Sequence, residues 1–332
     1  MASHFNLVTL SLAALTIIAA LAPAAANDMI DCSITVRKSS EAACTRIING
    51  VGNPKADRFM AYYNRAWFYL RQSNQAKALK DFDSAEKLDR NYSNLYLSRA
   101  QAKRELDDLD GAIADLDVYT VLEPGDWNGY YQRSQVERRL GNSKKALQSL
   151  NRAIELKPFE RALKPLQVLL LSDLGRQSEA AEEADRLVAG RRSDAVGRYA
   201  RAVVSFRRNA FDNALDDLKA ALRSRALFPA AYALRAQIFE LRGEIEDAKQ
   251  NYRSALKSAG PTLDQETAQE IARLRLDVLQ ADGSARYALR TSSESAFAQG
   301  GGVRAKVGET SKGDCRRYVP SANATVSVPC GD

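Results

Sequence analysis

The sequence predicts an all-α fold: a right-handed solenoid of stacked helical hairpins, followed by a small irregular tail closed by a disulfide. Alanine recurs at a constant interval, at Ala78, Ala112, Ala146, Ala180, Ala214 and Ala248. Twelve residues before each stands another residue, small in most copies: Ala66, Ala100, Ser134, Val168, Ala202 and Ala236. Self-similarity at a fixed period indicates stacked supersecondary units. Small residues at two fixed positions let the two helices of each unit approach closely.

Each period has the pattern of two short amphipathic helices joined by a tight turn. The segment "YYQRSQVERRLGNSKKALQSLNRAIELKP" occupies residues 130–158, with Gly141 between the helices and Pro158 after the second. Glycine ends a helix at little cost, and the residue before a proline disfavours the helical conformation. The same turn position holds Gly or Asn in four copies, at Gly141, Gly175, Asn209 and Gly243. We therefore expect hairpins and no sheet from about residue 59 to 260.

An aromatic residue also recurs, four positions before the first small residue of most copies. It is present at Tyr62, Tyr96, Tyr130 and Tyr232, whereas Lys164 and Arg198 replace it in copies four and five. Together with the period of about 34 residues, this pattern resembles the tetratricopeptide repeat, in an exported bacterial form. The resemblance covers six copies at residues 59–262.

The first cysteine pair extends the repeat toward the amino terminus. Cys32 and Cys44 lie one repeat period before Ala66 and Ala78, the positions at which small residues meet in the first copy. Residues 27–58 are therefore predicted to form a degenerate capping hairpin stapled by a disulfide. A terminal unit of a solenoid lacks one neighbour, so a covalent link is physically useful there.

The carboxy-terminal part changes character after the repeats. Residues 263–282 have the apolar spacing of a closing helix, and residues 283–314 are small, polar and Gly-rich, as in a flexible linker. The last segment, residues 315–332, contains Pro, Ser and Asn turn residues and the alternating "TVSV". We expect a β-loop there, closed by a disulfide between Cys315 and Cys330.

The amino terminus has the pattern of a signal peptide. Residues 1–26 contain no Lys, Arg, Asp or Glu, and include the apolar run "LVTLSLAALTIIAALA". Small residues precede a cleavage site after Ala26, although a buried core helix is the alternative interpretation. We expect a periplasmic or secreted protein. No later stretch of the sequence is long and apolar enough to span a membrane.

Histidine is almost absent, which restricts the chemistry. His4 is the only histidine, and cleavage of the signal peptide would remove it. The mature chain would then lack a His-dependent nucleophilic centre and a His-ligated metal site. We predict no catalytic residues, no metal and no cofactor, with carboxylate chemistry as the remaining enzymatic alternative.

Arginine recurs in five copies, at Arg65, Arg99, Arg133, Arg201 and Arg235. Sixteen residues after each stand Asp81, Asp115, Ser149, Asp217 and Asn251. One interpretation is a row of arginines that binds an anionic ligand. The other is a contact between the two helices of one hairpin, which the co-occurrence of Arg and Asp in three copies favours.

The first helices of stacked hairpins line a concave groove. Positions one, five and eight after the recurring aromatic residue are predicted to face it. From these positions we select as partner-binding residues Tyr63, Trp67, Gln101, Arg104, Tyr131, Gln135, Arg138 and Leu169. Aromatic and Arg side chains are common binding anchors. The alternative is that these side chains pack on one another or on the tail.

Charge is distributed unevenly along the chain, whose net charge is +7. Residues 93–126 have a net charge of −5, and residues 127–164 a net charge of +6. We predict a non-catalytic exported adaptor that binds a protein or peptide in the groove. The alternative is a binder of anionic cell-envelope polymer through the basic third repeat. Adjacent acidic and basic copies also favour self-association, whereas nucleic-acid binding would favour a continuous basic stripe.

Overall fold

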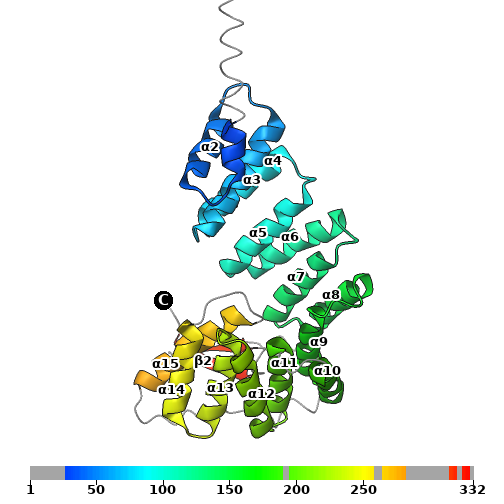
Figure 1. Ribbon diagram of the computed structural model, residues 1–332, viewed down its shortest axis with the longest axis vertical. Helices are drawn as coiled ribbons and strands as arrows, with labels where there is room; N and C mark the ends of the chain where they lie inside the picture. The colour runs from blue at the N-terminus through cyan, green and yellow to red at the C-terminus, as the bar shows by residue number, and fades with distance from the viewer. Residues whose placement is uncertain (1–26, 190–193, 258–263, 282–313, 320–323, 330–332) are drawn as a thin grey trace, which may run out of the picture. The chain divides into compact units, whose positions relative to one another are not determined.

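The computed structural model describes residues 27–189, 194–257, 264–281, 314–319 and 324–329 (Figure 1). The chain divides into two compact units, Met1–Val136 and Glu137–Asp332. The predicted signal peptide, residues 1–26, lies outside the described residues.

The first unit begins with a helical segment at residues 27–33. It continues with α2 (Lys38–Asn49), α3 (Lys55–Arg71), α4 (Gln75–Leu88), α5 (Ser93–Glu105), α6 (Leu109–Leu122) and most of α7 (Trp127–Arg139). Helix α2 packs on α3, α3 pairs with α4, and α5 pairs with α6. Because α4 also packs on α5, the two hairpins stack directly on each other.

The second unit begins with the end of α7. Its further helices are α8 (Ser143–Leu156), α9 (Leu163–Asp173), α10 (Gln177–Ala189), α11 (Ala195–Arg207), α12 (Phe211–Ser224), α13 (Pro229–Leu241), α14 (Ile245–Lys257) and α15 (Gln265–Ala281). The hairpins are α9 with α10, α11 with α12 and α13 with α14, and the second helix of each contacts the helix that follows. The predicted solenoid of helical hairpins is thus confirmed, and no strand occurs among the described residues between 59 and 260.

The turn inside each hairpin is made by one left-handed residue. The positive backbone φ angles recur with the period of the alanines, at Ser73 (53°), Asp107 (63°), Gly141 (80°), Gly175 (76°), Asn209 (58°) and Gly243 (77°). A left-handed residue reverses the chain at the end of a helix and satisfies its last carbonyl groups. The repeat therefore requires the left-handed backbone conformation at this position. Gly, Asn, Asp and Ser residues all adopt it here.

The recurring small residues are buried in every copy. All six alanines of the second helices, from Ala78 to Ala248, are fully buried. Their partners on the first helices, from Ala66 to Ala236, are at most 3% exposed. A larger side chain at either position would force the helices apart, because protein interiors are close-packed.

Four of the five recurring arginines join the helices of single hairpins, as the second interpretation of the sequence predicted. Their Nε atoms donate hydrogen bonds within the hairpin: Arg65 to Asp81 at 2.7 Å, Arg99 to Asp115 at 2.9 Å, Arg201 to Asp217 at 2.7 Å and Arg235 to Asn251 at 2.6 Å. The acceptor side chains are buried. These arginines therefore stabilise the repeat.

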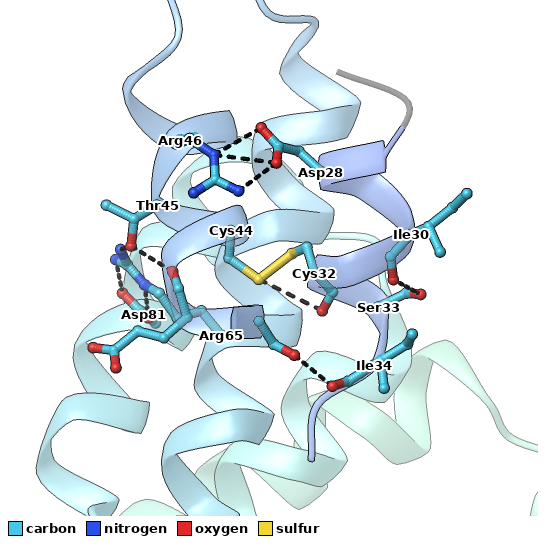
Figure 2. The surroundings of a disulfide bond; sticks show 12 residues. Asp28, Ile30, Cys32, Ser33, Ile34, Cys44, Thr45, Arg46, Arg65 and Asp81 are labelled. Carbon is cyan, nitrogen blue, oxygen red and sulfur yellow. Dashed lines mark hydrogen bonds and ion pairs between the residues drawn. A yellow bond between two sulfur atoms is a disulfide. The ribbon is translucent and has the colours of Figure 1, made fainter. Parts of the chain in front are cut away.

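The amino-terminal cap is stapled as predicted. Cys32 and Cys44 form a disulfide that joins residues 27–33 to α2 (Figure 2). The cap is fixed to the first hairpin by polar contacts: Arg65 Nη1 donates to Thr45 Oγ1 at 2.8 Å, and the Tyr69 hydroxyl donates to Glu41 at 2.7 Å. The capping unit thus continues the stack.

The carboxy-terminal part contains a helix and a pair of strands, the kinds of element that the sequence predicts there. Helix α15 lies within the predicted closing helix and packs on α13 and α14. Strands β1 (Asp314–Val319) and β2 (Ala324–Pro329) pair antiparallel, with Cys315 opposite Val328. Cys330 and residues 283–313 of the predicted linker lie outside the described residues, so the second disulfide stays a prediction.

Candidate functional site

A cavity of about 210 Å³ opens in the first unit between helices α3, α5 and α7. Its apolar lining comes from Trp67, Leu97, Ala100, Leu116 and Val136, and its polar lining from Ser98, Gln101, Arg104, Asn128 and Gln132. First helices of three successive copies thus contribute to one site. Stacked hairpins are expected to form a groove lined by their first helices, and we refer to this cavity as the groove of the first unit.

The apolar wall of the cavity is anchored by Trp67 on α3. Its indole is half-buried and packs on the edge of a core that includes Phe59, Tyr96 and Tyr119. Leu97 on the same wall is also half-buried, whereas Val136 is 1% exposed. A half-buried aromatic beside a closed apolar floor can receive an apolar side chain of a ligand.

The polar wall combines amides with one guanidinium group. Arg104 Nη1 donates a hydrogen bond to Gln132 Oε1 at 3.0 Å, which links α5 to α7 across the cavity. Gln101 is exposed, and its Nε2 donates to Glu105 Oε1 at 3.3 Å. Amide side chains both donate and accept hydrogen bonds. They therefore suit the N–H and C=O groups of a peptide backbone.

Three of the predicted binding residues, Trp67, Gln101 and Arg104, line this one cavity. Tyr63 does not line it. Its hydroxyl lies 3.2 Å from Ser98 Oγ, and its ring contacts Phe59, Phe82 and Tyr92. It packs between the first two copies, as the alternative interpretation allowed.

The face of α7 that lines the cavity is not the face that the sequence predicted. The cavity is lined by Asn128, Gln132 and Val136, whereas Tyr131 and Gln135 are half-buried on another part of the helix. The ring of Tyr131 lies 6.0 Å from that of Trp127. The reason is geometric: one helix presents different residues to the preceding and the following copy.

The prediction that Arg138 is a solvated groove residue is wrong. Its side chain is 5% exposed in the second unit, and its Nε lies 2.6 Å from Asp173 Oδ2. Its Nη1 pairs with Asp264, just before α15. Burial disfavours the charged guanidinium, but the charges of Asp173 and Asp264 outweigh this and raise the pKa of Arg138. Arg138 is therefore part of a buried ionic cluster.

Two more side chains complete this cluster. Arg207 Nη2 pairs with Asp173, and its Nη1 donates to Ser172 Oγ at 3.1 Å. The Tyr199 hydroxyl donates to Asp264 Oδ2 at 3.0 Å, and burial, followed by the charge of Asp264, raises its pKa. The cluster ties α7, α9 and α11 to the residue that precedes α15.

The prediction that Leu169 faces the groove as a partner-binding residue is also wrong. Leu169 is fully buried in a core shared by α9, α11, α13 and α15. Ile271 and Leu276 of α15 belong to the same core. In α9, the residue that was predicted to face the groove therefore packs inside the second unit.

Sequence reasoning missed Ser98, Asn128, Gln132 and Val136. Each lies on the side of its helix that faces a neighbouring first helix, and the prediction considered a single groove-facing side. Ser98, Gln132 and Val136 follow the aromatic position by two or six residues, which are offsets that the prediction did not assign to the groove.

Among the described residues, no group of three His, Cys, Asp or Glu side chains is arranged to hold a metal ion. Within the same part of the chain, none of the helices combines the length and apolarity that crossing a membrane requires.

Comparison with known proteins finds similarity to a known repeat in two segments. The family model of the tetratricopeptide repeat matches residues 61–92 and 128–160. No match is found among curated proteins.

Solved structures share the fold. A tetratricopeptide repeat protein from Parabacteroides merdae is 18% identical with a TM-score of 0.63, covering 71% of this chain and 91% of its own. YrrB, described as a repeat protein with an unusual peptide-binding site, is 20% identical with a TM-score of 0.45, covering 57% and 95%. PilW, a type IV pilus biogenesis factor, is 14% identical with a TM-score of 0.49, covering 64% and 98%. The first similarity supports the fold alone, and the lower scores of the other two carry no argument about this chain.

Proposed function

We propose that this protein is an exported, non-catalytic adaptor that binds an extended segment of a partner protein in the groove of its first unit. The observation that supports this proposal is the cavity between α3, α5 and α7, where Trp67 faces the amides of Gln101 and Gln132. The signal-peptide pattern of residues 1–26 supports export.

The chemistry of the two walls defines the ligand that fits best. One apolar side chain of the ligand would lie against Trp67, Leu97 and Val136, and backbone groups on either side would meet the amides. Arg104 would add a donor for a carbonyl or carboxylate oxygen. An extended peptide exposes such groups, whereas a folded surface keeps most of its backbone groups paired.

The proposal can be tested with the protein's own fluorescence. The chain has two tryptophans, so replacing Trp127 by phenylalanine leaves Trp67 as the reporter of the cavity. Peptides selected from a random display library on the full chain should change the emission of Trp67 on binding. Their affinity should fall by about tenfold or more in Trp67→Ala, because buried aromatic anchors dominate binding energy.

A matched control separates this effect from a general loss of aromatic surface. Phe159 in the second unit is 96% exposed, and Phe159→Ala should leave peptide affinity unchanged. Peptides that bind Trp67→Ala as tightly as the parent would contradict the proposal. Equal losses in both variants would also contradict it.

A further inference from the structure

A second cavity, of about 620 Å³, lies in the second unit between α10, α11 and α12. We call it the α10–α12 cavity. Five basic residues line it, namely Arg198, Arg201, Arg208, Lys219 and Arg223, together with three aspartates. None of these residues belongs to the groove of the first unit.

Copies four and five depart from the repeat at the aromatic position, where Lys164 and Arg198 stand. In copies one, two and six, the recurring tyrosine lies beside the recurring arginine, with 5.6, 5.5 and 5.3 Å between ring and guanidinium. In copy five the arginine is Arg201, and Arg198 stands where the tyrosine would be. The bulk of an aromatic ring is therefore missing, and a second guanidinium group has taken its place.

The charges in the cavity are only partly balanced. Arg198 and Arg201 both pair with Asp217, at 3.0 and 2.7 Å, and Arg201 also pairs with Asp185 at 3.0 Å. Arg208, Lys219 and Arg223 are exposed, and the structure shows no ion-pair partner for them among its described residues. Three solvated cations thus surround an open cavity.

The preceding copy provides an internal comparison. The equivalent cavity, one repeat period earlier in the sequence, lies between α8, α9 and α10 and measures about 200 Å³. It is lined by three glutamates and two arginines. The positions equivalent to Arg208, Lys219 and Arg223 hold Leu174, Asp185 and Ala189. Repeat geometry alone therefore produces neither the volume nor the positive charge.

The last copy differs from copy five at the aromatic position. It repeats the basic residues, at Arg242, Arg253 and Lys257, but it keeps Tyr232 at the aromatic position. Arg242 is moreover paired with Asp212 at 2.6 Å. Copy five thus combines three basic residues with the loss of the ring.

From this combination we propose that the α10–α12 cavity binds a ligand that carries two or more closely spaced phosphate groups. Guanidinium and ammonium groups form short, charge-assisted hydrogen bonds with phosphate oxygens. Three cations without an ion-pair partner in the described part of the chain exceed what one phosphate group needs, so a ligand with two or more phosphate groups matches them better. The cavity is open enough to admit a chain of phosphates.

The test uses tripolyphosphate as the probe, titrated calorimetrically into the full chain. Binding should be measurable at about 50 mM salt and weaker at about 200 mM, because salt screens exposed charges. The triple variant Arg208→Gln, Lys219→Gln and Arg223→Gln should weaken it by about tenfold or more. Inorganic phosphate, which has a single phosphate group, should bind more weakly than tripolyphosphate.

The matched control removes the same charge elsewhere. Lys144, Lys145 and Arg152 on α8 are also exposed, and their triple glutamine variant should bind tripolyphosphate within about twofold of the parent, since screening limits distant charge effects. Equal losses in the two variants, or a larger loss in the α8 variant, would overturn the proposal. So would a parent chain that does not bind tripolyphosphate at low salt.

A second variant tests the cavity without touching the exposed cations. Arg198→Tyr introduces the residue of copies one, two, three and six and should fill part of the space. Tripolyphosphate binding should therefore weaken, while the melting temperature stays close to that of the parent. Unchanged binding in Arg198→Tyr would show that the cavity is not the site. Because no residue of the first unit is involved, this outcome is independent of the peptide test.

Discussion

Replacing Arg138 by alanine should destabilise the second unit strongly. The Arg138 side chain is 5% exposed and that of Asp173 is 1% exposed. Removing one partner of a buried ion pair costs about 3–5 kcal/mol, because the other charge remains buried without it. In the variant, Asp173 would still pair with Arg207, and Asp264 would still accept a hydrogen bond from Tyr199. We therefore expect the loss of unfolding free energy to lie near the lower end of this range.

Urea unfolding followed by far-ultraviolet circular dichroism measures this loss in the full chain. Arg104→Ala is the matched control, because Arg104 is half-buried on the groove of the first unit. Its removal should cost about 1 kcal/mol, the value of a typical hydrogen bond. A smaller loss for Arg138→Ala than for Arg104→Ala would refute the reasoning.

A double-mutant cycle identifies the source of the effect. If Asp264 is a partner of Arg138, Asp264→Asn should cost less in the Arg138→Ala background than in the parent, with a coupling of about 0.5–3 kcal/mol. Strictly additive losses would show that the two side chains act independently.

Two predictions concern the first unit. Replacing Cys32 and Cys44 together by serine should lower the free energy of unfolding by about 3 kcal/mol, because the short disulfide loop restricts the unfolded chain; equal urea midpoints for the variant and the oxidised parent would contradict this. Burial, and then the hydrogen bond to Glu41, raise the pKa of Tyr69 to about 12. The folded chain therefore holds this proton more tightly, and the resulting stability is complete below about pH 10 and lost as the pH rises through 12. Tyr69→Phe should lose less stability than the parent over this interval in pH-dependent unfolding, and an equal loss would be inconsistent with the assignment.

The repeat could be predicted from sequence because its determinants are local and periodic. The positions of Ala66 and Ala78 define which helices meet, and the same register applies to every copy. Ser73 and Asp107 were missed as turn residues because their side chains do not mark a left-handed conformation as glycine does. Their positions, one repeat period apart, contain that information.

The candidate site could be predicted only where a single helix face decides it. Trp67, Gln101 and Arg104 lie on the faces of α3 and α5 that the period assigns to the groove. On α7, the side chains that meet the preceding helix are Asn128 and Gln132, and choosing them requires the position of α5. The helix that packs against α7 therefore decides which of its residues line the cavity, and the repeat period does not specify that helix.

The errors at Arg138 and Leu169 have a different cause. Both positions have the spacing of groove residues, but residues of the closing segment contact them or share their core. Asp264 is separated from Arg138 by 126 residues, and no local pattern indicates which distant segment returns to a given helix.

The contact between Arg138 and Asp264 has a consequence for how the second unit folds. In a solenoid, each copy interacts with its nearest neighbours, so unfolding can begin at one end and spread copy by copy. A contact that joins α7 to the start of α15 opposes such stepwise fraying, since opening either end also breaks the cluster. Contacts so distant in sequence form late, because closing a long loop costs entropy before any contact is gained. The second unit should therefore assemble gradually and, once Asp264 has docked, unfold as a single block.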